Sequence, residues 1–283
     1  MVADEGSSPS HSKPVPSKEL TTRVLSALVM VAAALLTAYW GGWPFALFWL
    51  AAGIAIVVEW TDMTGIEPRR LVQAVLGLGL AALTLLFLLD AGLWPSLVVS
   101  LVALAAGAFA ASGAQKRVWV VSSFIYAVPI VLVPPMVRAH PDLGILGLLW
   151  MFAVVWATDI AAYFTGRTFG GPKLCPPISP KKTWSGFVGG VVAATAGGLL
   201  VAWIGQRYGA TLPLGFSGIA ALSIVASIAS QVGDLGESAL KRHCQVKDSS
   251  HLIPGHGGVM DRLDGFWAVC LIVLVLLPLA PTV

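Results

Sequence analysis

Seven long segments of this sequence contain no charged residue. They cover residues 24–58, 71–89, 91–115, 118–137, 183–206, 208–233 and 265–283. Each is about as long as the roughly 20 residues that a helix needs to cross the hydrocarbon core of a bilayer. Only 11% of all residues are charged, compared with about 25% in an average soluble domain. The sequence therefore predicts an all-α polytopic integral membrane protein, and it excludes the collagen-like, disordered and disulfide-scaffold classes.

The uncharged segments divide into about nine transmembrane helices. As one helix, the first segment would be about 52 Å long, which exceeds a hydrocarbon core of about 30 Å. Gly41, Gly42 and Pro44, flanked by tryptophans, instead indicate a turn at the membrane interface. The predicted spans cover about residues 23–40, 44–60, 71–89, 92–112, 118–137, 143–165, 184–206, 213–241 and 265–281.

Lysine and arginine fall almost entirely on one side of these spans. If the N-terminus is inside, only Arg138 and Arg207 of the 17 basic residues lie outside. The inner residues are Lys13, Lys18, Arg23, Arg69, Arg70, Lys116, Arg117, Arg167, Lys173, Lys181, Lys182, Lys241, Arg242, Lys247 and Arg262. Such asymmetry is typical of cytoplasmic loops. It predicts an inside N-terminus, an outside C-terminus and a multi-pass protein of the cell (inner) membrane.

The chain is expected to divide into three parts. Residues 1–22 are polar, rich in Ser and Pro and without the apolar core of a signal peptide, which predicts a disordered cytoplasmic tail. Residues 23–140 hold the first five spans. Their carboxylates Glu59, Asp62 and Asp90 stand at predicted helix ends, where a charge can be solvated, so this part is expected to be a scaffold. Residues 141–283 hold most of the functional-looking polar side chains, in loops at the cytoplasmic face.

Some partners and sites are excluded by what the chain lacks. The three cysteines form no CxxC pair, so neither a disulfide framework nor a zinc site is indicated. The sequence contains no basic stretch interleaved with aromatic residues, so no nucleic-acid partner is expected.

One group of polar residues follows the eighth apolar segment. If the span continues as a helix, Asp234, Glu237, Ser238 and Lys241 share one face. Carboxylates so close to a membrane span are costly unless they meet a partner or a cation. The alternative is an ordinary helix end with an internal Glu–Lys pair.

A glycine-rich loop and two aspartates come next. Gly255, Gly257 and Gly258 allow the backbone to approach a ligand and to present N–H groups to phosphate oxygens. Asp261 and Asp264 stand three apart at the start of the last helix. Mg²⁺ is commonly held by one or two carboxylates together with substrate phosphates, so this pattern favours a site for a metal and a phosphorylated substrate over a simple turn.

A third group lies upstream. Asp159 interrupts an apolar span, which by itself suggests a functional site, and Tyr163 follows one turn later. Lys181 and Lys182 could bind an anion or could only enforce the topology.

These residues resemble the signature of one family. The stretch from Ser238 through Lys241, Arg242, Lys247 and Asp248 to Pro254-Gly-His-Gly-Gly-Val-Met-Asp-Arg-Leu-Asp264 is similar to that of phosphatidate cytidylyltransferases, or CDP-diacylglycerol synthases. Asp159-(three residues)-Tyr163-(two)-Gly-Arg167 and Ser179-Pro-Lys-Lys-Thr-Trp184 resemble an earlier motif of this family. The resemblance covers about residues 155–266. Where the family more usually has Glu after the tryptophan, this chain has Ser185, which puts an acidic role there in doubt.

The resemblance implies transfer of CMP from CTP to phosphatidate at the cytoplasmic membrane face, giving CDP-diacylglycerol and pyrophosphate. It implies that Asp234 and Asp261 bind Mg²⁺ or Mn²⁺, with a second cation near them. The implied catalytic residues are Asp234, Asp261, Lys241, Arg242, Lys247, Asp248, His256, Arg262 and Asp264. The implied substrate-binding residues are Asp159, Tyr163, Arg167, Ser179, Lys181, Lys182, Thr183, Glu237, Ser238, Gly257 and Gly258. The implied partners are CTP, phosphatidate, the lipid bilayer and a second copy of the chain.

Three other readings are weaker. A CDP-alcohol phosphotransferase would show DGxxARxxxxxxxxGxxxD, but the single Asp-Gly here, Asp264-Gly265, is followed by an apolar helix. A transporter would place its charges near the bilayer midplane, whereas these gather at one face. A CTP-dependent lipid kinase is nearer, and it differs in whether the product retains CMP or gains only a phosphate.

Overall fold

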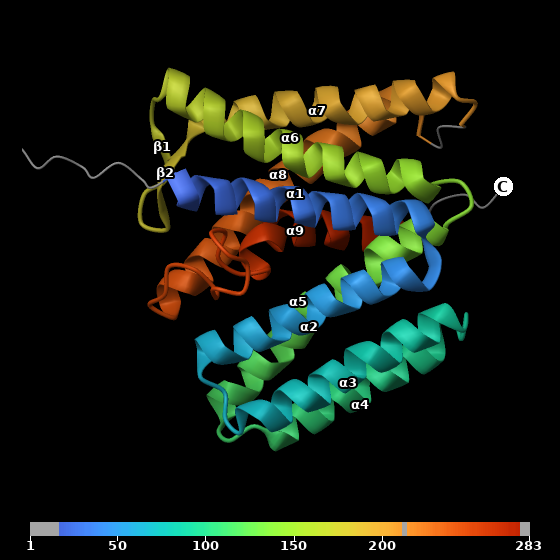
Figure 1. The fold of residues 1–283 in the computed structure, drawn as a ribbon, viewed down its shortest axis with the longest axis vertical. Coiled ribbons are helices and arrows are strands. Elements are labelled where there is room, and N and C mark those ends of the chain that lie inside the picture. The colour runs from blue at the N-terminus through green and yellow to red at the C-terminus, as the bar shows by residue number, and fades with distance from the viewer. Residues whose placement is uncertain (1–16, 211–213, 278–283) are drawn as a thin grey trace, which may run out of the picture.

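The computed structural model describes residues 17–210 and 214–277. In this part of the chain nine helices and one β-hairpin follow one another (Figure 1). They are α1 (Ser17–Trp40), α2 (Gly42–Thr64), α3 (Arg69–Leu88), α4 (Leu93–Ala110), α5 (Ala114–Ala139), α6 (Gly144–Phe169), β1 (Lys173–Cys175), β2 (Ser179–Thr183), α7 (Trp184–Arg207), α8 (Gly215–His243) and α9 (Met260–Leu276). The helices α1 to α8 are long and apolar enough to cross a membrane.

The predicted all-α membrane fold is confirmed, with differences at the ends of elements. Gly41 begins the turn that divides the first apolar segment, with a φ of 66°. Helix α1 begins at Ser17, earlier than the predicted residue 23, so the predicted tail 1–22 is helical in its last residues, and residues 1–16 lie outside the described chain. Residues 278–281, at the end of the ninth predicted span, also lie outside the described chain.

The hairpin was not predicted. Its strands are antiparallel, with Lys173 opposite Thr183 and Cys175 opposite Ser179. Pro176, Pro177 and Pro180 lie in or between these strands, and proline removes the N–H that a helix would need. The hairpin places Lys181 and Lys182 at the end of the helical bundle.

Close helix packing in the second half depends on small residues. Helices α6 and α7 lie side by side, and α7 and α9 both contact α8 (Figure 1). A Cβ atom on Gly186 would lie 2.8 Å from the carbonyl oxygen of Ala162, and one on Gly190 would lie 3.0 Å from that of Thr158. The glycines therefore let the two backbones approach, as is common between membrane helices.

An aromatic stack joins the two halves of the chain. The Trp49 ring of α2 lies parallel to the Phe266 ring of α9, with centroids 5.1 Å apart, and it also stacks on Phe152 of α6. These rings are buried. The N-terminal half is therefore packed against the helices that carry the predicted site.

The two ends of the bundle differ. The hairpin, the start of α1, the end of α8 and the loop before α9 lie at one end, and α9 runs toward the opposite end (Figure 1). Arg138, one of the two predicted outer basic residues, binds the carbonyl oxygens of Ala38 and Tyr39 at the far end of α1. Of the described helices, α1 to α8 have the length and composition of membrane spans and α9, with 17 described residues, does not, so the ninth span and the inside–outside orientation stay predictions.

Candidate active site

A cleft of about 730 Å³ opens at the end of the bundle that carries the hairpin. Helices α6, α7, α8 and α9, both strands and the loop after α8 contribute to its walls. Twelve predicted site residues line it: Asp159, Tyr163, Arg167, Lys181, Lys182, Thr183, Asp234, Lys241, Asp248, Asp261, Arg262 and Asp264. Segments that are more than a hundred residues apart in the sequence therefore meet in one place.

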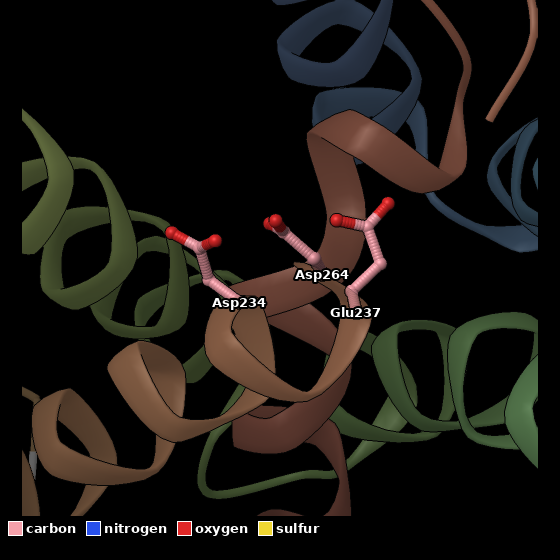
Figure 2. Close-up of side chains that lie close together, drawn as sticks. All are labelled: Asp234, Glu237 and Asp264. Atoms are coloured by element: carbon pink, nitrogen blue, oxygen red, sulfur yellow. The ribbon is translucent and has the colours of Figure 1, made fainter. Parts of the chain in front are cut away.

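Three carboxylates cluster beside the cleft. Asp234 and Glu237 stand one turn apart on α8, and Asp264 reaches the same space from α9 (Figure 2). One oxygen from each lies within 4.8 Å of the others. Glu237 is only 3% exposed, and its Oε1 has no hydrogen-bond partner among the described residues. Three carboxylates gathered in so small a space form an all-oxygen donor set that fits a hard cation such as Mg²⁺.

This cluster and the predicted metal pair share one member. Asp234 belongs to it, but Asp261 is not part of the three-carboxylate group. Asp264 and Glu237, which were predicted to serve other roles, complete the group with Asp234. The pairing of Asp234 with Asp261 stays a prediction, and the geometry adds Asp264 as a competing ligand.

Lysines lie between the carboxylates. Lys182 Nζ is 2.6 Å from Asp234 Oδ2. Lys241 Nζ is 2.8 Å from Glu237 Oε2 and 2.7 Å from Asp261 Oδ1, so one ammonium joins α8 to α9. The Glu237–Lys241 pair is the internal pair that the simpler interpretation of this segment expected. It is part of a wider network at the cleft, however, rather than a solvated helix end.

Asp261 is the most heavily bonded of these carboxylates. Its Oδ2 accepts hydrogen bonds from the N–H of Gly258 (2.8 Å), from the N–H of Ser249 (2.9 Å) and from Ser249 Oγ (3.0 Å). It lies in the first turn of α9, next to the preceding loop and before the uncharged segment that begins at Gly265. Burial alone would raise the pKa of Asp261, but the hydrogen bonds from Lys241, Gly258 and Ser249 outweigh it and hold this pKa below its usual value. Asp261 is therefore ionised at neutral pH.

The glycine-rich loop has the backbone that only glycine adopts easily. Gly257 has a φ of 85°, and a Cβ there would lie 2.7 Å from Asp261 Oδ2. A Cβ on Gly258 would overlap Ser249 Oγ. These two glycines therefore allow the loop to close over Asp261.

His256 is held by the first helix. Its Nδ1 lies 2.8 Å from Ser26 Oγ, which also lies 3.0 Å from the carbonyl oxygens of Arg23 and Pro254. Because the hydroxyl has one proton and two carbonyls compete for it, His256 Nδ1 is best placed as the donor. A second hollow of about 560 Å³ lies here, lined by His256 and Gly257 together with Lys247, Asp248 and Arg262.

The upstream motif also lines the cleft. Asp159 is exposed to it, and Tyr163 OH accepts a hydrogen bond from Arg167 (2.8 Å). Thr183 caps α7 by accepting from the N–H of Gly186 (3.1 Å). Thr183 therefore has a structural role at the start of α7 as well as a position on the cleft wall.

Some predicted residues lie beside the cleft rather than on its surface. Arg242 is exposed at the end of α8 and lines neither hollow. Ser179 pairs with Cys175 in the hairpin, and Ser238 donates a long hydrogen bond of 3.4 Å to Asp234. Gly258, which is part of the loop before α9, is buried.

The expectation that Glu59 is a solvated carboxylate at a helix end is wrong. Its side chain is 1% exposed and binds the loop before α9. Asp62 and Asp90 are exposed, as expected. Glu59 directly follows a long apolar segment, and an ionisable residue in that position is a functional candidate by the same argument that singled out Asp159.

The fold and this site together define a class of protein. It is a helical membrane protein that presents lysines, arginines and clustered carboxylates in one cleft, a combination suited to phosphate groups and a divalent cation.

Comparison with known proteins is consistent with this class. A sequence model of the Cytidylyltransferase family matches residues 21–280. The chain is 41% identical to the phosphatidate cytidylyltransferase of Brucella suis biovar 1 over 249 residues, which are 88% of this chain and 90% of that protein. It is 44% identical to the phosphatidate cytidylyltransferase of Bacillus subtilis over 130 residues, 46% of each chain. It is 45% identical to that of Haemophilus influenzae over 131 residues. The chain belongs to the cytidylyltransferase family and is a nucleotidyltransferase, which confirms the resemblance found in the sequence.

Proposed function

We propose that this enzyme transfers CMP from CTP to phosphatidate, giving CDP-diacylglycerol and pyrophosphate. The observation that carries the proposal is the cleft at the end of the bundle, where clustered carboxylates, lysines and arginines meet. The names of its relatives supply the substrates. A lipid could enter this cleft from the membrane, and a nucleotide could enter it from the aqueous side.

The chemistry requires one anion to attack another. A phosphate oxygen of phosphatidate forms a bond to the α-phosphorus of CTP, and the bond from that phosphorus to the bridging oxygen of the β-phosphate breaks, releasing pyrophosphate. The second pKa of a phosphate monoester is about 6, so the nucleophile needs little deprotonation at neutral pH. Catalysis is then mainly positioning and stabilisation of charge.

The described side chains provide these functions. Lys182, Lys241 and Arg262 line the cleft and would hold phosphate oxygens. Lys247, with His256 and the loop glycines, would hold the triphosphate from the second hollow. Asp159, Tyr163 and Arg167 would form the wall against the lipid headgroup.

The carboxylate cluster would hold the divalent cation. Asp234 is common to the predicted pair and to the cluster. Asp261 or Asp264 would be its partner, and Glu237 is the third carboxylate of the cluster. A bound Mg²⁺ or Mn²⁺ would neutralise phosphate charge and make pyrophosphate a better leaving group. Space for a second cation is part of the same proposal.

The site would face the cytoplasm in the inner membrane. Support comes from the basic residues. The helix ends and loops that carry most of them lie at the cleft end of the bundle, and an excess of Lys and Arg is typical of cytoplasmic loops. CTP would then be supplied directly from the cytoplasm. A homodimer, which the resemblance also implies, stays a prediction.

The test uses the purified chain in mixed micelles that contain either phosphatidate or diacylglycerol, with Mg²⁺ and with CTP labelled on either the α- or the γ-phosphate. Transfer of only the α-label into lipid, with release of pyrophosphate, supports the proposal. Transfer of the γ-label to diacylglycerol would instead identify a lipid kinase. No labelled lipid from either substrate would overturn the assignment.

A further inference from the structure

Glu59 of α2 is anchored to the loop between α8 and α9. Its Oε1 accepts hydrogen bonds from Ser250 Oγ and from the N–H of Val259, both at 2.7 Å. Its Oε2 accepts from the N–H of Met260 at 2.7 Å and lies 3.1 Å from Ser249 Oγ, whose one proton it shares with Asp261 Oδ2. A fully buried carboxylate thus has all of its hydrogen bonds to one segment, about two hundred residues later in the chain.

We propose that Glu59 is a positioning residue for the transfer reaction. Val259 and Met260 carry two of the N–H groups that have no partner within α9, because they stand at its start. Glu59 satisfies both, and its negative charge also matches the positive end of the helix dipole. Asp261 and Asp264 follow directly, so the contact fixes the rotation and the depth of the helix turn that carries both carboxylates.

A second connection runs through Ser249. Its Oγ lies 3.1 Å from Glu59 Oε2 and 3.0 Å from Asp261 Oδ2. The single hydroxyl therefore stands between the buried anchor and a carboxylate at the cleft. Gly258 lies against both Glu59 and Ser249, and a Cβ there would be 2.7 Å from Glu59 Oε1. The glycine that the sequence linked to phosphate binding is thus also required for this close approach.

The alternative is that Glu59 only ties two helices together. Helices α2 and α9 are already joined by the stack of Trp49 on Phe266, which lies elsewhere on both helices. Removing Glu59 should therefore loosen the loop more than the bundle. This difference separates positioning from general stability.

A glutamine cannot replace the glutamate without loss. Each carboxylate oxygen accepts one backbone N–H, from Val259 on one side and from Met260 on the other. In either orientation, the NH₂ group of a glutamine would face one of these donors. Serine hydroxyls can turn, but backbone N–H groups in a helix turn cannot.

The experiment compares the full-length wild type with Glu59→Gln, Glu59→Asp and Asp62→Asn in detergent. Asp62 is the matched control, because it is a carboxylate on the same helix but is exposed to solvent. Two quantities are measured: hydrogen–deuterium exchange of the 249–260 peptides, and kcat with KM for phosphatidate. For Glu59→Gln we expect faster exchange confined to these peptides and a kcat lower by at least about tenfold, the scale of one hydrogen bond to a charged group. KM for phosphatidate should change less than kcat, Glu59→Asp should recover part of the loss, and Asp62→Asn should match the wild type.

Several results would overturn the inference. One is unchanged exchange or unchanged kcat in Glu59→Gln, and another is faster exchange spread over all helices. If Glu59→Gln does not fold, Ser249→Ala replaces it, since it keeps the backbone contacts of Glu59. We then expect faster loop exchange and a smaller loss of kcat, and wild-type values in both would reject the role.

The inference rests on the proposed function, but the two fail differently. If the function is wrong, the wild type transfers no CMP, whereas its loop is still protected by Glu59. If only the positioning role is wrong, the wild type is active and Glu59→Gln is equally active.

Discussion

Lys182 and Asp234 form an ion pair, with Nζ 2.6 Å from Oδ2, that joins the hairpin to α8 across the cleft. The sequence alone could not distinguish Lys182 from its neighbour Lys181. The structure does, because Lys181 is exposed and has no ion pair among the described residues, whereas Lys182 contacts a carboxylate of the acidic cluster. The two lysines should therefore respond differently to mutation.

We predict that Lys182→Met lowers turnover by at least about a hundredfold, the scale of one lost element of electrostatic stabilisation. Lys181→Met should cost no more than about fivefold, as for a solvent-exposed charge. Both variants are assayed as CDP-diacylglycerol formation at saturating CTP, after membrane levels have been matched. Equal losses in the two variants would show that the ion pair has no special role.

The metal site gives a second prediction. Asp234→Asn and Asp261→Asn should each lower turnover by at least about a hundredfold, because asparagine keeps the shape but removes the charge. If both residues serve one cation, the double variant should be far less than multiplicatively worse. Full activity in excess EDTA, or near-wild-type turnover in either single variant, would contradict this assignment.

A third prediction separates Asp261 from Asp264 as the partner of Asp234. The residue that binds the cation should, when changed to asparagine, raise the Mg²⁺ concentration for half-maximal turnover by at least about tenfold, since even outer partners of a metal ligand affect affinity about 10–100-fold. The cluster geometry favours Asp264. Mn²⁺ binding to the purified variants, followed by electron paramagnetic resonance, provides a readout independent of activity. A raised requirement in Asp261→Asn alone would favour the original pair.

The fold was predictable because a membrane helix requires an uncharged segment of about 20 residues, which can be recognised in the sequence. The gathering of Asp159, Asp234 and Asp261 at one end followed from the parity of the spans. What could not be predicted was which carboxylates meet. Asp261 and Asp264 are both near the start of α9, and the rotation of that helix decides which of them faces Asp234.

The burial of Glu59 also could not be predicted from the sequence. This residue stands at the border of an apolar segment, where a solvated helix end and a buried anchor look alike. Only the tertiary arrangement places Val259 and Met260 against it. The hairpin escaped prediction for a similar reason: its short strands contain no apolar alternation, and the bundle determines their position.

Ser185 provides a fourth prediction. Its Oγ donates a hydrogen bond to the carbonyl of Gly170 and lies 3.0 Å from Thr183 Oγ1, and it does not line the cleft. Ser185→Ala should therefore keep turnover within about fivefold of wild type, while lowering the midpoint of thermal unfolding because a hydrogen bond worth about 1 kcal/mol is lost. Ser185→Glu should not raise activity greatly. A large loss of turnover in Ser185→Ala with unchanged stability would show a direct role in the reaction.

The last prediction concerns orientation. The start of α1 and the end of α9 lie at opposite ends of the bundle, so the two termini should be on opposite sides of the membrane. Because the basic residues favour an inside N-terminus, a reporter fused after Val283 should behave as extracytoplasmic, and a cysteine placed at exposed Leu252 should react with reagents from the cytoplasmic side. The matched control is a cysteine at Tyr208, which is exposed at the other end, beyond Arg207, and should react from outside. Labelling of both positions from the same side would contradict the nine-span arrangement, and exchange of the two sides would reverse the proposed location of the active site.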